Sequence, residues 1–452
     1  MKSSIAVVVL AAGAGTRMKS SMPKVLHELA GWPMVRHVLE NVGRLGPSRV
    51  VGVVAPGADN VAAAFRPHPT VVQSEPLGTG HAAKAALGLL TDHCGPVLVV
   101  FGDAPLITTT SLRRLLDAFT ERKAVVGVLG FRASDPSPYG RLIVRDGELE
   151  RIVESKEADA AERAVDFCNS GVMCIDGEKI SHLLAALRND NSKGEYYLTD
   201  AVAIARARGD LTIAIEGDEE EFQGINSRVE LAAGEAALQR RLRKTALEAG
   251  VTMIDPSTVW LAADTELGED VTIGPNVRFG LGVTVASNVE IAAFCDISGC
   301  RIGKGARIGP FARIRPGSDV AEDAHIGNFV ELRATKMGRG AKANHLAYLG
   351  DADIGAGSNI GAGTIAVNYD GYCKHRTVVE AHAFIGSNSS LIAPVKVGMG
   401  ANIAAGSVIS EDVPAGALAF GRARQVIKKE RAAPLRAKLG ALAAAVRQAR
   451  HY

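Results

Sequence analysis

A glycine-rich segment, LAAGAGTRMKSSMPK at residues 10–24, contains the first residues whose types and spacing suggest chemistry. Gly13 and Gly15 leave backbone N–H groups free to cradle phosphate oxygens, while Arg17 and Lys24 supply positive charge. The segment lacks the GKS or GKT ending of a Walker loop and the third glycine of a dinucleotide-binding fingerprint. We therefore predict a triphosphate-binding turn of another kind; the alternative is a tight turn that only carries surface charges.

A single histidine, His345 in the segment NHLAYLGD, is the second candidate. Imidazole titrates near neutral pH and can accept a proton from an attacking amine. Isolated histidines are more often structural than catalytic, so the residue type alone does not assign a function. His345 is of interest because it lies where an otherwise regular repeat is interrupted.

The elements that position the glycine-rich segment follow an alternating pattern. Short β-branched runs, IAVVVL, VVGVVA and VLVVF, alternate with helical patterns near residues 34–45 and around Val61. Buried apolar runs separated by helices are typical of a doubly wound, Rossmann-like α/β domain with a parallel sheet covered on both faces. Ligands bind such sheets beyond the carboxyl ends of the strands, where residues 10–24 and the segment FGDAPL are expected to lie.

An internal repeat occupies the second half of the chain. Apolar residues recur every six positions from Leu261 to Ile297, from Ile302 to Ile326 and from Val379 to Ile409, and 24 of the 49 glycines lie in residues 251–421. This spacing predicts a parallel β-helix of hexapeptide repeats, in which the inward apolar residues stack as a ladder. We expect insertions near Cys300 and between residues 335 and 377, because the phase of the repeat breaks there.

Two helices are predicted outside these domains. Residues 227–250 are rich in strong helix formers and stop at Gly250, which indicates one connecting helix. The basic, alanine-rich tail at residues 422–452 predicts a C-terminal helix. We interpret the basic residues of both helices as solvated faces, not as nucleic-acid sites. The predicted domains are therefore residues 1–226, 227–250, 251–421 and 422–452.

Composition excludes several classes of protein. The chain has 452 residues, a formal net charge of +2, 47% apolar residues and 22% charged residues. These values are typical of a soluble globular protein of several domains and disfavour disorder, bulk binding of nucleic acid and a membrane protein. The six cysteines form no CxxC pair and are expected to be reduced thiols, so we predict a cytoplasmic protein with no nucleic-acid or membrane partner.

Several motifs together resemble known families. The segments LAAGAGTRM and PK, QSEPLGTGHA at residues 73–82 and FGDAPL at residues 101–106 are similar to those of sugar-1-phosphate nucleotidyltransferases. Their coupling to a hexapeptide β-helix with NHLAYLGDADIG and NIGAGTIAVNYDG resembles the bacterial bifunctional N-acetylglucosamine-1-phosphate uridylyltransferase and glucosamine-1-phosphate acetyltransferase family. The resemblance covers residues 5 to about 425. It implies a left-handed β-helix, UTP and acetyl-CoA as substrates, and a homotrimer.

The resemblance assigns roles to residues of the first domain. Arg17 and Lys24 are expected to neutralise charge during uridylyl transfer, and Asp103 and Asn226 to hold Mg²⁺. UTP and the sugar are expected to contact a set of residues spread over the domain, namely Leu10, Gly13, Lys24, Gln73, Gly78, Thr79, Gly140, Glu154, Asn169 and Asn226. Phe101 departs from the family, which often has tyrosine there, so the resemblance implies that a hydroxyl contact is missing.

The resemblance also assigns roles in the β-helix. His345 is expected to accept a proton from glucosamine 1-phosphate, with Glu331, Asn368 and Tyr369 orienting the reacting groups. The sugar phosphate is expected to contact Arg315, Arg333, Tyr348, Asn359 and Lys374. Acetyl-CoA is expected to contact Ala362, Ser387, Ala405 and Arg422 in a groove between copies of the chain. Arg333 is a second departure, since the family commonly has lysine there and arginine presents a different donor geometry.

The resemblance predicts two reactions, acetylation of glucosamine 1-phosphate followed by uridylyl transfer to the product. Two alternatives remain. In one, the chain catalyses only nucleotidyl transfer and the β-helix is an oligomerisation or regulatory arm, as in ADP-glucose pyrophosphorylases. In the other, the chain is a non-enzymatic subunit of a translation exchange factor, which predicts an eroded phosphate loop, whereas Arg17, Lys24 and Asp103 are present.

Overall fold

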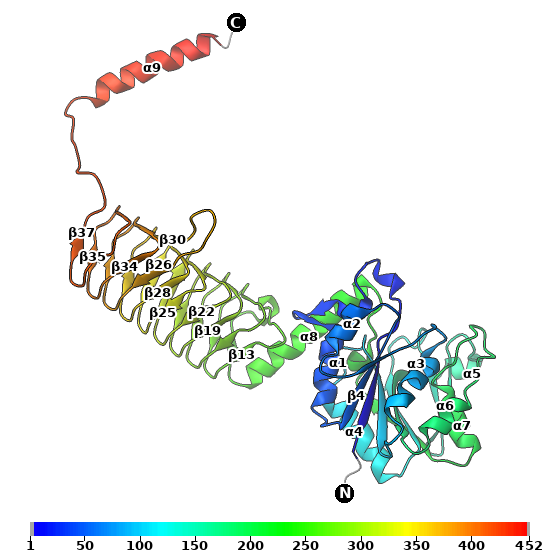
Figure 1. Cartoon of the computed structure of the whole chain (residues 1–452). Helices are drawn as coiled ribbons and strands as arrows, with labels where there is room; N and C mark the ends of the chain where they lie inside the picture. Colours follow the sequence, from blue (N-terminus) through cyan, green and yellow to red (C-terminus); the bar gives the residue numbers. More distant parts are fainter. Residues whose placement is uncertain (1–3, 450–452) are drawn as a thin grey trace. The chain divides into compact units, whose positions relative to one another are not determined.

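The computed structural model describes residues 4–449; residues 1–3 and 450–452, at the outer ends of the first predicted domain and of the predicted tail, lie outside the described residues. The chain divides into two compact units, Met1–Thr284 and Val285–Tyr452 (Figure 1). This division falls within the hexapeptide repeats. The predicted boundaries after residues 226, 250 and 421 remain predictions.

A mixed β-sheet forms the centre of the first unit. Its strand order is β11-β7-β10-β6-β1-β4-β5, with β8 paired to β10 and β9 paired to β8. The strands are β1 (Ala6–Leu10), β4 (Arg49–Val54), β5 (Thr70–Val72), β6 (Pro96–Phe101), β7 (Val126–Arg132), β8 (Arg141–Arg145), β9 (Glu148–Val153), β10 (Phe167–Asp176) and β11 (Thr212–Gly217). A small hairpin pairs β2 (Glu28–Leu29) with β3 (Trp32–Pro33). The three predicted apolar runs are thus β1, β4 and β6.

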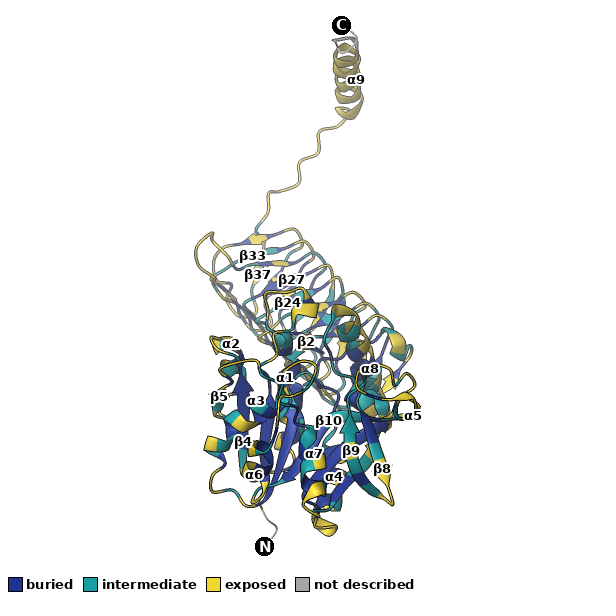
Figure 2. Ribbon diagram, turned by 90° about the vertical axis from the view of Figure 1, so that its right-hand side faces the viewer, coloured by how far each residue is buried: buried dark blue, intermediate teal, exposed yellow. Residues whose placement is uncertain are grey.

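Helices cover both faces of this sheet. Alternate residues of β1 enter two separate cores, with Val7 and Val9 in one and Val8 and Leu10 in the other. The first core includes side chains of α1 (Met34–Gly43) and α4 (Thr109–Glu121), and the second includes side chains of α3 (Thr79–Ala85), α6 (Ile180–Ala185) and α7 (Asp200–Ala207). The strands are accordingly the most buried elements (Figure 2). The predicted doubly wound α/β class is confirmed.

Two strands, β9 and β10, contradict the prediction of a parallel sheet, since β8 pairs antiparallel with both of them. β1 pairs in parallel with β4 and β6, but β10 runs antiparallel to both β6 and β7. A register shift in β10 between Asn169 and Met173 marks a bulge. Apolar runs predict burial on two faces but carry no information on strand direction, which depends on how the chain crosses the sheet.

The predicted connecting helix is α8 (Arg228–Glu248), in the first unit. The Ser227 side chain caps it by accepting the Glu230 N–H at 3.3 Å, and the chain leaves the helix at Gly250, which has a φ of 92°. Gln239 is buried, and its amide exchanges two hydrogen bonds, of 2.6 and 2.9 Å, with the backbone of Leu261. α8 is therefore fixed to the start of the repeats.

Short strands, most of them with a buried apolar residue, form the repeats. In the first unit these are β12 (Thr252–Met253), β13 (Glu266–Leu267), β14 (Thr272–Ile273), β15 (Arg278–Phe279) and β16 (Thr284–Val285). In the second unit every third strand pairs in parallel, giving three sheets, as in β20 (Arg307–Ile308) with β23 (His325–Asn328). The ladder residues Ile308 and Ile326 are buried at 1% and 0% exposure. The predicted parallel β-helix is confirmed.

The other strands of the second unit complete the three sheets. They are β17 (Glu290–Ile291), β18 (Asp296–Ile297), β19 (Cys300–Ile302), β21 (Arg313–Ile314), β22 (Ser318–Val320), β24 (Glu331–Arg333), β25 (Lys336–Met337), β26 (Lys342–His345), β27 (Tyr348–Gly350), β28 (Ala352–Ile354), β29 (Asn359–Ile360), β30 (Ile365–Val367), β31 (Thr377–Val379), β32 (Phe384–Ile385), β33 (Ser390–Ile392), β34 (Val395–Val397), β35 (Asn402–Ile403), β36 (Val408–Ile409) and β37 (Leu418–Ala419).

The predicted insertions are largely wrong. Near Cys300 no loop is inserted, because β19 follows β18 directly and the corner is only shortened. Between residues 335 and 377 the coil continues through β25 to β30, and only residues 368–376 form an inserted loop. Alanines such as Ala343 and Ala366 take the inward positions there and are buried at 0% and 1% exposure, so the ladder continues without the large side chains that reveal it in the sequence.

The remaining helices are short, apart from the one in the tail. They are α2 (Asp59–Ala64) and α5 (Ala160–Arg163) in the first unit and α9 (Ala432–Ala449) in the second. The predicted C-terminal helix is thus α9. None of the helices among residues 4–449 combines the length and the apolar character that crossing a bilayer requires.

Candidate active sites

A cavity of about 310 Å³ opens at the carboxyl ends of β1 and β6. Seven of the predicted residues line it, together with neighbours from the same loops: Leu10, Ala11, Ala12, Gly13, Ala14, Lys24, Val25, Gln73, Pro76, Gly78, Thr79, Ala82, Phe101, Asp103 and Glu195. Its position is the one expected for a ligand of a doubly wound sheet. Glu195 was not predicted, and its sequence neighbourhood gives no recognisable signal.

Lys24 joins two residues that are far away in the sequence. Its Nζ contacts the carboxylate of Asp103 and donates to Oδ1 of Asn226 at 2.9 Å. The side chains of Lys24 and Asp103 are only 11% and 18% exposed. Two oxygen atoms therefore converge on one cationic group at the edge of the cavity.

This geometry fits a divalent cation such as Mg²⁺. A carboxylate and an amide oxygen are hard ligands, and the ammonium of Lys24 already places positive charge between them. Among residues 4–449 no group of three or more His, Cys, Asp and Glu side chains is arranged to hold a metal. A metal at Asp103 and Asn226 would thus depend on substrate and water oxygens for its other ligands.

Backbone hydrogen bonds fix the two candidate metal ligands, Asp103 and Asn226. The Gly102 N–H donates to the Leu10 carbonyl at 2.9 Å, and the Ile225 N–H donates to the Asp103 carbonyl at 3.0 Å. The Asn226 N–H donates to Oε2 of Glu230 at 2.6 Å, within the first turn of α8. Glu230 was not predicted, although its position three residues after the cap Ser227 is a recognisable helix-start pattern.

Two glycines allow the loops to approach each other. Gly15 has a φ of 61°, and a Cβ there would lie 2.6 Å from the Cβ of Lys24. Gly78 has a φ of 99°, and a Cβ would lie 2.7 Å from the carbonyl oxygen of Tyr196. Both positions therefore require glycine. Arg17, in the 3-10 helix Thr16–Met18, is exposed and is not among the residues that line the cavity.

The segment predicted to contact uracil is held from two sides. The Gln73 amide donates to the Gly78 carbonyl at 3.1 Å, and the Thr79 hydroxyl accepts the Leu198 N–H at 3.1 Å. The Gly80 N–H donates to the Tyr196 carbonyl at 2.8 Å. Residues 195–198 thus brace this wall of the cavity.

The other predicted sugar-binding residues lie outside the lining set. The Asn169 N–H donates to the Gly140 carbonyl at 2.8 Å, and Oδ1 of Asn169 accepts the Gly171 N–H at 2.9 Å. Glu154 accepts a long hydrogen bond of 3.4 Å from the Thr199 hydroxyl, and burial raises the pKa of Glu154. Burial and the nearby carboxylates of Glu157, Glu154 and Asp190 also raise the pKa of Asp200 to about 6.

Phe101 fills space that a side chain at residue 171 would need. A Cβ on Gly171 would lie 2.6 Å from Cε2 of Phe101, and Gly171 has a φ of 85°. Phe101 lines the cavity and is partly buried. Its ring therefore contributes apolar surface at this position.

In the second unit, His345 pairs with one residue of the preceding coil. The strand register places Asn328 opposite His345, and Nδ1 of His345 lies 2.5 Å from Oδ1 of Asn328. An amide oxygen can only accept a hydrogen bond, so Nδ1 carries the proton and Nε2 keeps its lone pair. The exposed His345 ring is thus held in the form that can accept a proton at Nε2. Asn328 was not predicted.

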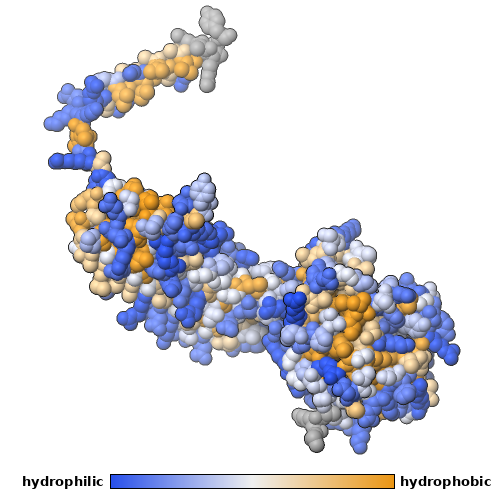
Figure 3. All heavy atoms as spheres, in the orientation of Figure 1, coloured by the Kyte–Doolittle hydropathy of each residue, from blue (hydrophilic) through white to orange (hydrophobic). Residues whose placement is uncertain are grey.

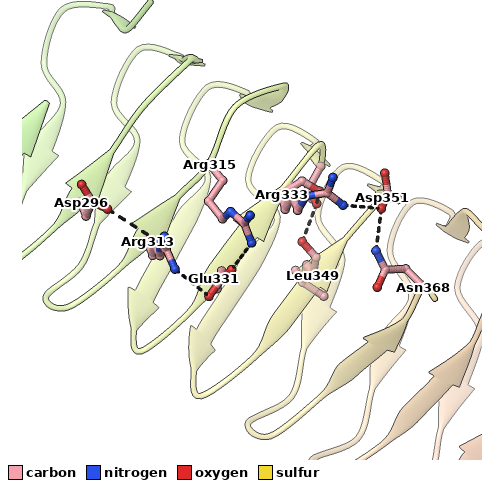
Figure 4. Close-up of polar contacts among 9 residues, drawn as sticks. Asp296, Arg313, Arg315, Glu331, Arg333, Leu349, Asp351 and Asn368 are labelled. Carbon is pink, nitrogen blue, oxygen red and sulfur yellow. Dashed lines mark hydrogen bonds and ion pairs between the residues drawn. The ribbon is translucent and has the colours of Figure 1, made fainter. Parts of the chain in front are cut away.

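Glu331, predicted to help orient the reacting groups, contacts two arginines. Its carboxylate accepts from Nη1 of Arg315 at 2.9 Å and lies 3.9 Å from Nη1 of Arg313 (Figure 4). The Arg315 and Glu331 side chains are 38% and 30% exposed. Glu331 is therefore paired with Arg315, which is predicted to contact the phosphate, while Asn328 contacts the histidine.

Asp351 links two further predicted residues. Oδ2 of Asp351 lies 3.2 Å from Nη1 of Arg333 and accepts from Nδ2 of Asn368 at 2.6 Å (Figure 4). A Cβ on Gly350 would lie 2.6 Å from the Tyr348 hydroxyl and 2.7 Å from Nδ2 of Asn368, so these groups meet over the glycine. Asp351 was not predicted.

The inserted loop at residues 368–376 is braced by its own side chains. Tyr369 and Lys374 form a β-bridge, and the Tyr369 hydroxyl donates to the Gly371 carbonyl at 2.5 Å. Asp370 accepts the Cys373 N–H at 2.7 Å and the Tyr372 N–H at 2.8 Å. These two backbone donors, with the His375 ring, hold the pKa of Asp370 well below its usual range. Lys374 itself is exposed.

The residues predicted to contact acetyl-CoA lie at one corner of successive coils. The Ala362 carbonyl accepts the Asn388 N–H at 2.7 Å, and the Ser387 carbonyl accepts the Gly406 N–H at 2.8 Å. Ser387, Ala405 and Arg422 are exposed. Asn359 starts β29 and pairs in register with Lys342 and Phe384. His345 belongs to the same corner, since its carbonyl accepts the Gly363 N–H at 3.3 Å.

Comparison with known proteins gives matches for both halves. A MobA-like NTP transferase domain matches residues 7–169, and bacterial transferase hexapeptide repeats match residues 299–334 and 376–411. The chain is 54% identical to the bifunctional protein GlmU of Paramagnetospirillum magneticum, over 97% of this chain and 98% of the relative. It is 55% identical to the bifunctional protein GlmU of Acidiphilium cryptum, over 96% and 98% of the two chains.

Proposed function

The chain belongs to the family of bifunctional GlmU proteins, and we propose on this premise how its two sites divide the work. The protein transfers an acetyl group from acetyl-CoA to glucosamine 1-phosphate, and then a uridylyl group from UTP to N-acetylglucosamine 1-phosphate with release of pyrophosphate. Nucleotidyl transfer alone and a non-enzymatic exchange factor are therefore excluded. The roles of individual residues, the metal, the oligomer and the location are the proposal.

Uridylyl transfer takes place in the cavity at the ends of β1 and β6. A phosphate oxygen of the sugar attacks the α-phosphorus of UTP and pyrophosphate leaves in line with it, so the protein must hold two anions together. Lys24 contacts the triphosphate from the cavity wall, and Arg17 adds positive charge from the exposed loop. Asp103 and Asn226 would hold Mg²⁺, which supplies further neutralisation of phosphate charge. The convergence of Lys24, Asp103 and Asn226 is the observation that carries this assignment.

Acetyl transfer uses His345. Nε2 accepts a proton from the amine of glucosamine 1-phosphate as the nitrogen attacks the thioester carbonyl. The C–N bond forms, the C–S bond breaks, and the proton on Nε2 can pass to the departing thiolate. The hydrogen bond from Nδ1 to Asn328 keeps the imidazole in the required form throughout.

The sugar phosphate is bound by Arg315, Arg333, Tyr348 and Lys374. Arg315 and Arg333 are each paired with an acid, Glu331 and Asp351, which orients the guanidinium groups. Arg333 replaces the lysine common in the family and keeps the positive charge. One nitrogen of its guanidinium group, Nη1, pairs with Asp351, and the others remain available for the phosphate. Asn368 and Tyr369 belong to the inserted loop, and Asn359 starts β29, which pairs with the strand that carries His345.

Acetyl-CoA lies along the corner formed by Ala362, Ser387, Ala405 and Arg422, between copies in a homotrimer. A stack of exposed apolar side chains supports association of the β-helices. The ring centroids of Phe294 and Phe311 are 4.9 Å apart and those of Phe311 and Phe329 are 5.0 Å apart, with the rings 51%, 44% and 54% exposed. A contiguous exposed apolar patch of this kind is typical of an interface.

We place the enzyme in the cytoplasm. UTP and acetyl-CoA are the substrates, and all six cysteines are free thiols, two of them exposed. The partners in this proposal are small molecules and further copies of the chain.

Mass spectrometry of reaction products tests the proposed division of labour. Purified protein is incubated with glucosamine 1-phosphate, acetyl-CoA, UTP and Mg²⁺. A second reaction omits acetyl-CoA, and a third omits it but supplies N-acetylglucosamine 1-phosphate. UDP-N-acetylglucosamine should form in the first and third reactions only. Consumption of acetyl-CoA at the normal rate after replacement of His345 by asparagine would remove the histidine from the mechanism.

A further inference from the structure

The helix in the tail of the chain, α9, carries a stripe of apolar side chains that are exposed in the structure. Four side chains of α9 are half-exposed, Leu435 at 56%, Leu439 at 57%, Leu442 at 54% and Val446 at 49%. Val426 and Ile427, just before the helix, are 77% and 74% exposed. Figure 3 shows hydrophobic residues along α9 beside strongly hydrophilic ones.

The stripe has the geometry of an amphipathic helix. At about 100° per residue, the four large side chains fall within an arc of roughly 60°, and Ala432 and Ala443 widen it to roughly 100°. Basic residues border this arc on both sides. Lys438 lies on one border, and Arg436 and Arg447 lie on the other. The opposite face consists mainly of small residues, namely Ala433, Ala437, Gly440, Ala441 and Ala444, together with Gln448.

Charge is strongly segregated between the tail and the rest of the chain. Residues 422–452 contain nine of the 51 Lys and Arg residues and one of the 49 acidic residues. The tail therefore carries a formal charge of +8, while residues 1–421 carry −6. The nearly neutral total of +2 conceals a segment that attracts anions.

We propose that α9 docks on an anionic lipid surface, with Leu435, Leu439, Leu442 and Val446 inserted among the acyl chains at the headgroup boundary. Lys438 on one border and Arg436 and Arg447 on the other then reach the phosphate groups of the lipids. The basic residues at 424–431 add electrostatic attraction beside the helix. The expectation from composition that no membrane is involved averages the tail with the rest of the chain.

The same stripe is poorly suited to association between copies of α9. Positions 435, 439, 442 and 446 have the spacing of a coiled-coil seam, but the flanking positions hold Arg436, Lys438 and alanines. No acidic side chain within α9 can pair across such a seam. Bringing tails of charge +8 together would concentrate positive charge, whereas an anionic surface neutralises it.

A single helix of this size binds a bilayer weakly, so attachment needs both the apolar stripe and the charge. Several tails on one oligomer would bind the same surface together and raise the apparent affinity. Reversible attachment is thus the expected behaviour, with the degree of binding set by lipid charge and by salt.

Sedimentation with vesicles tests the proposal on the full chain. Vesicles of phosphatidylcholine alone are compared with vesicles of phosphatidylcholine and phosphatidylglycerol in equal amounts. We expect the protein to pellet only with the second kind at about 0.1 M salt, and to be released at about 1 M salt, where the Debye length falls from roughly 10 Å to 3 Å.

A matched pair of variants separates the apolar stripe from the charge. The double substitution Leu439→Glu and Leu442→Glu puts two acids on the stripe, and Ala437→Glu and Ala444→Glu puts the same two acids on the opposite face. Both lower the charge of the tail equally. We expect the first variant to lose at least about tenfold in vesicle affinity beyond the loss of the second, since only the first removes apolar insertion.

Three results would overturn the proposal. They are no pelleting of the unmodified chain with anionic vesicles at low salt, equal losses for the two variants, and a fall in the molar mass of the oligomer for the stripe variant alone, which would assign the stripe to contacts between copies. Uridylyl and acetyl transfer by both variants serve as the control for folding. Neither activity is expected to change, so a failure here leaves the proposed catalytic function untouched.

Discussion

The two active sites are built by different kinds of folding. In the first unit, Lys24 contacts Asp103 and Asn226, which lie 79 and 202 positions further along the sequence. They meet because separate loops end at the same edge of a sheet. In the second unit, His345 meets Asn328, 17 positions away, because one coil of the β-helix separates them. Long-range convergence thus forms one site, and a constant local period forms the other.

The two sites also differ in exposure. Lys24 and Asp103 are 11% and 18% exposed, so their charges interact in a poorly solvated cavity wall. His345 is exposed, and Arg315 is 38% exposed. A single chain therefore encloses the nucleotide site much better than the acetyl-transfer site, which is consistent with the proposed need for a neighbouring copy.

The largest expected effect comes from Asp103→Ala. It removes a metal ligand and leaves Lys24 without its carboxylate, so uridylyl transfer should fall by about 10³-fold or more. Acetyl transfer measured on the same preparation should stay unchanged. Asp92→Ala is the matched control, because Asp92 pairs with Arg49 on the surface of the same unit. Equal loss of both activities after Asp103→Ala would break the separation of the sites.

The reciprocal prediction concerns His345→Asn. Loss of the proton acceptor should lower acetyl transfer by about 10²–10³-fold, with uridylyl transfer unchanged. His382→Asn is the control, since His382 is also exposed in the β-helix and asparagine tolerates its φ of 58°. Acetyl transfer at the normal rate in the His345 variant would return this histidine to a structural role.

A smaller effect is expected from Asn328→Ala. The variant frees the Nδ1 proton of His345 and allows the unproductive tautomer, so kcat for acetyl transfer should fall about tenfold. KM for both substrates should stay near its normal value, because Asn328 contacts neither in the proposal. Asn328→Asp keeps an acceptor for the Nδ1 proton and should recover most of kcat. A change in KM without a change in kcat would argue against a positioning role.

The period of the β-helix explains what could be predicted about the second site. Asp351 lies 18 residues after Arg333 and Asn328 lies 17 before His345, each one coil away from its partner. Counting coils would have found both. The coils between residues 335 and 377 were hidden, because Ala343 and Ala366 occupy inward positions that the pattern reserves for larger side chains.

The first unit shows what a sequence pattern does not contain. The runs in β1, β4 and β6 predicted strands and burial, because apolar side chains must leave water on both faces of the sheet. The antiparallel direction of β10 and the lining role of Glu195 depend on the path of the whole chain. Motif resemblance supplied Asp103 and Asn226, but Glu230, which the helix-start pattern after Ser227 marks, was not connected to Asn226, because that contact depends on how the chain enters α8.

The smallest predicted effect is on stability, and it comes from the buried carboxyl group of Asp200 in the first unit. Burial and nearby carboxylates raise the pKa of Asp200, in the first turn of α7, from 3.8 to about 6. The folded state thus favours the protonated form, so its contribution to stability is full below pH 4 and is lost as the pH rises through 6. Asp200→Asn should therefore raise the free energy of unfolding by about 1–2 kcal/mol at pH 8 and leave it almost unchanged near pH 4. In the second unit, Glu331 and Asp351 have arginine partners and should not show this gain.

Tryptophan fluorescence can follow the unfolding that this prediction concerns. Both tryptophans, Trp32 and Trp260, lie in the first unit, so their emission reports on that unit alone. Asp59→Asn is the matched control, because Asp59 also lies in the first turn of a helix but is exposed. It should lose the small stabilisation that an acid gives a helix start, about 0.3–1 kcal/mol, and gain nothing at high pH. A gain for Asp200→Asn that is the same at pH 4 and pH 8 would mean that packing, not the buried charge, separates the two variants.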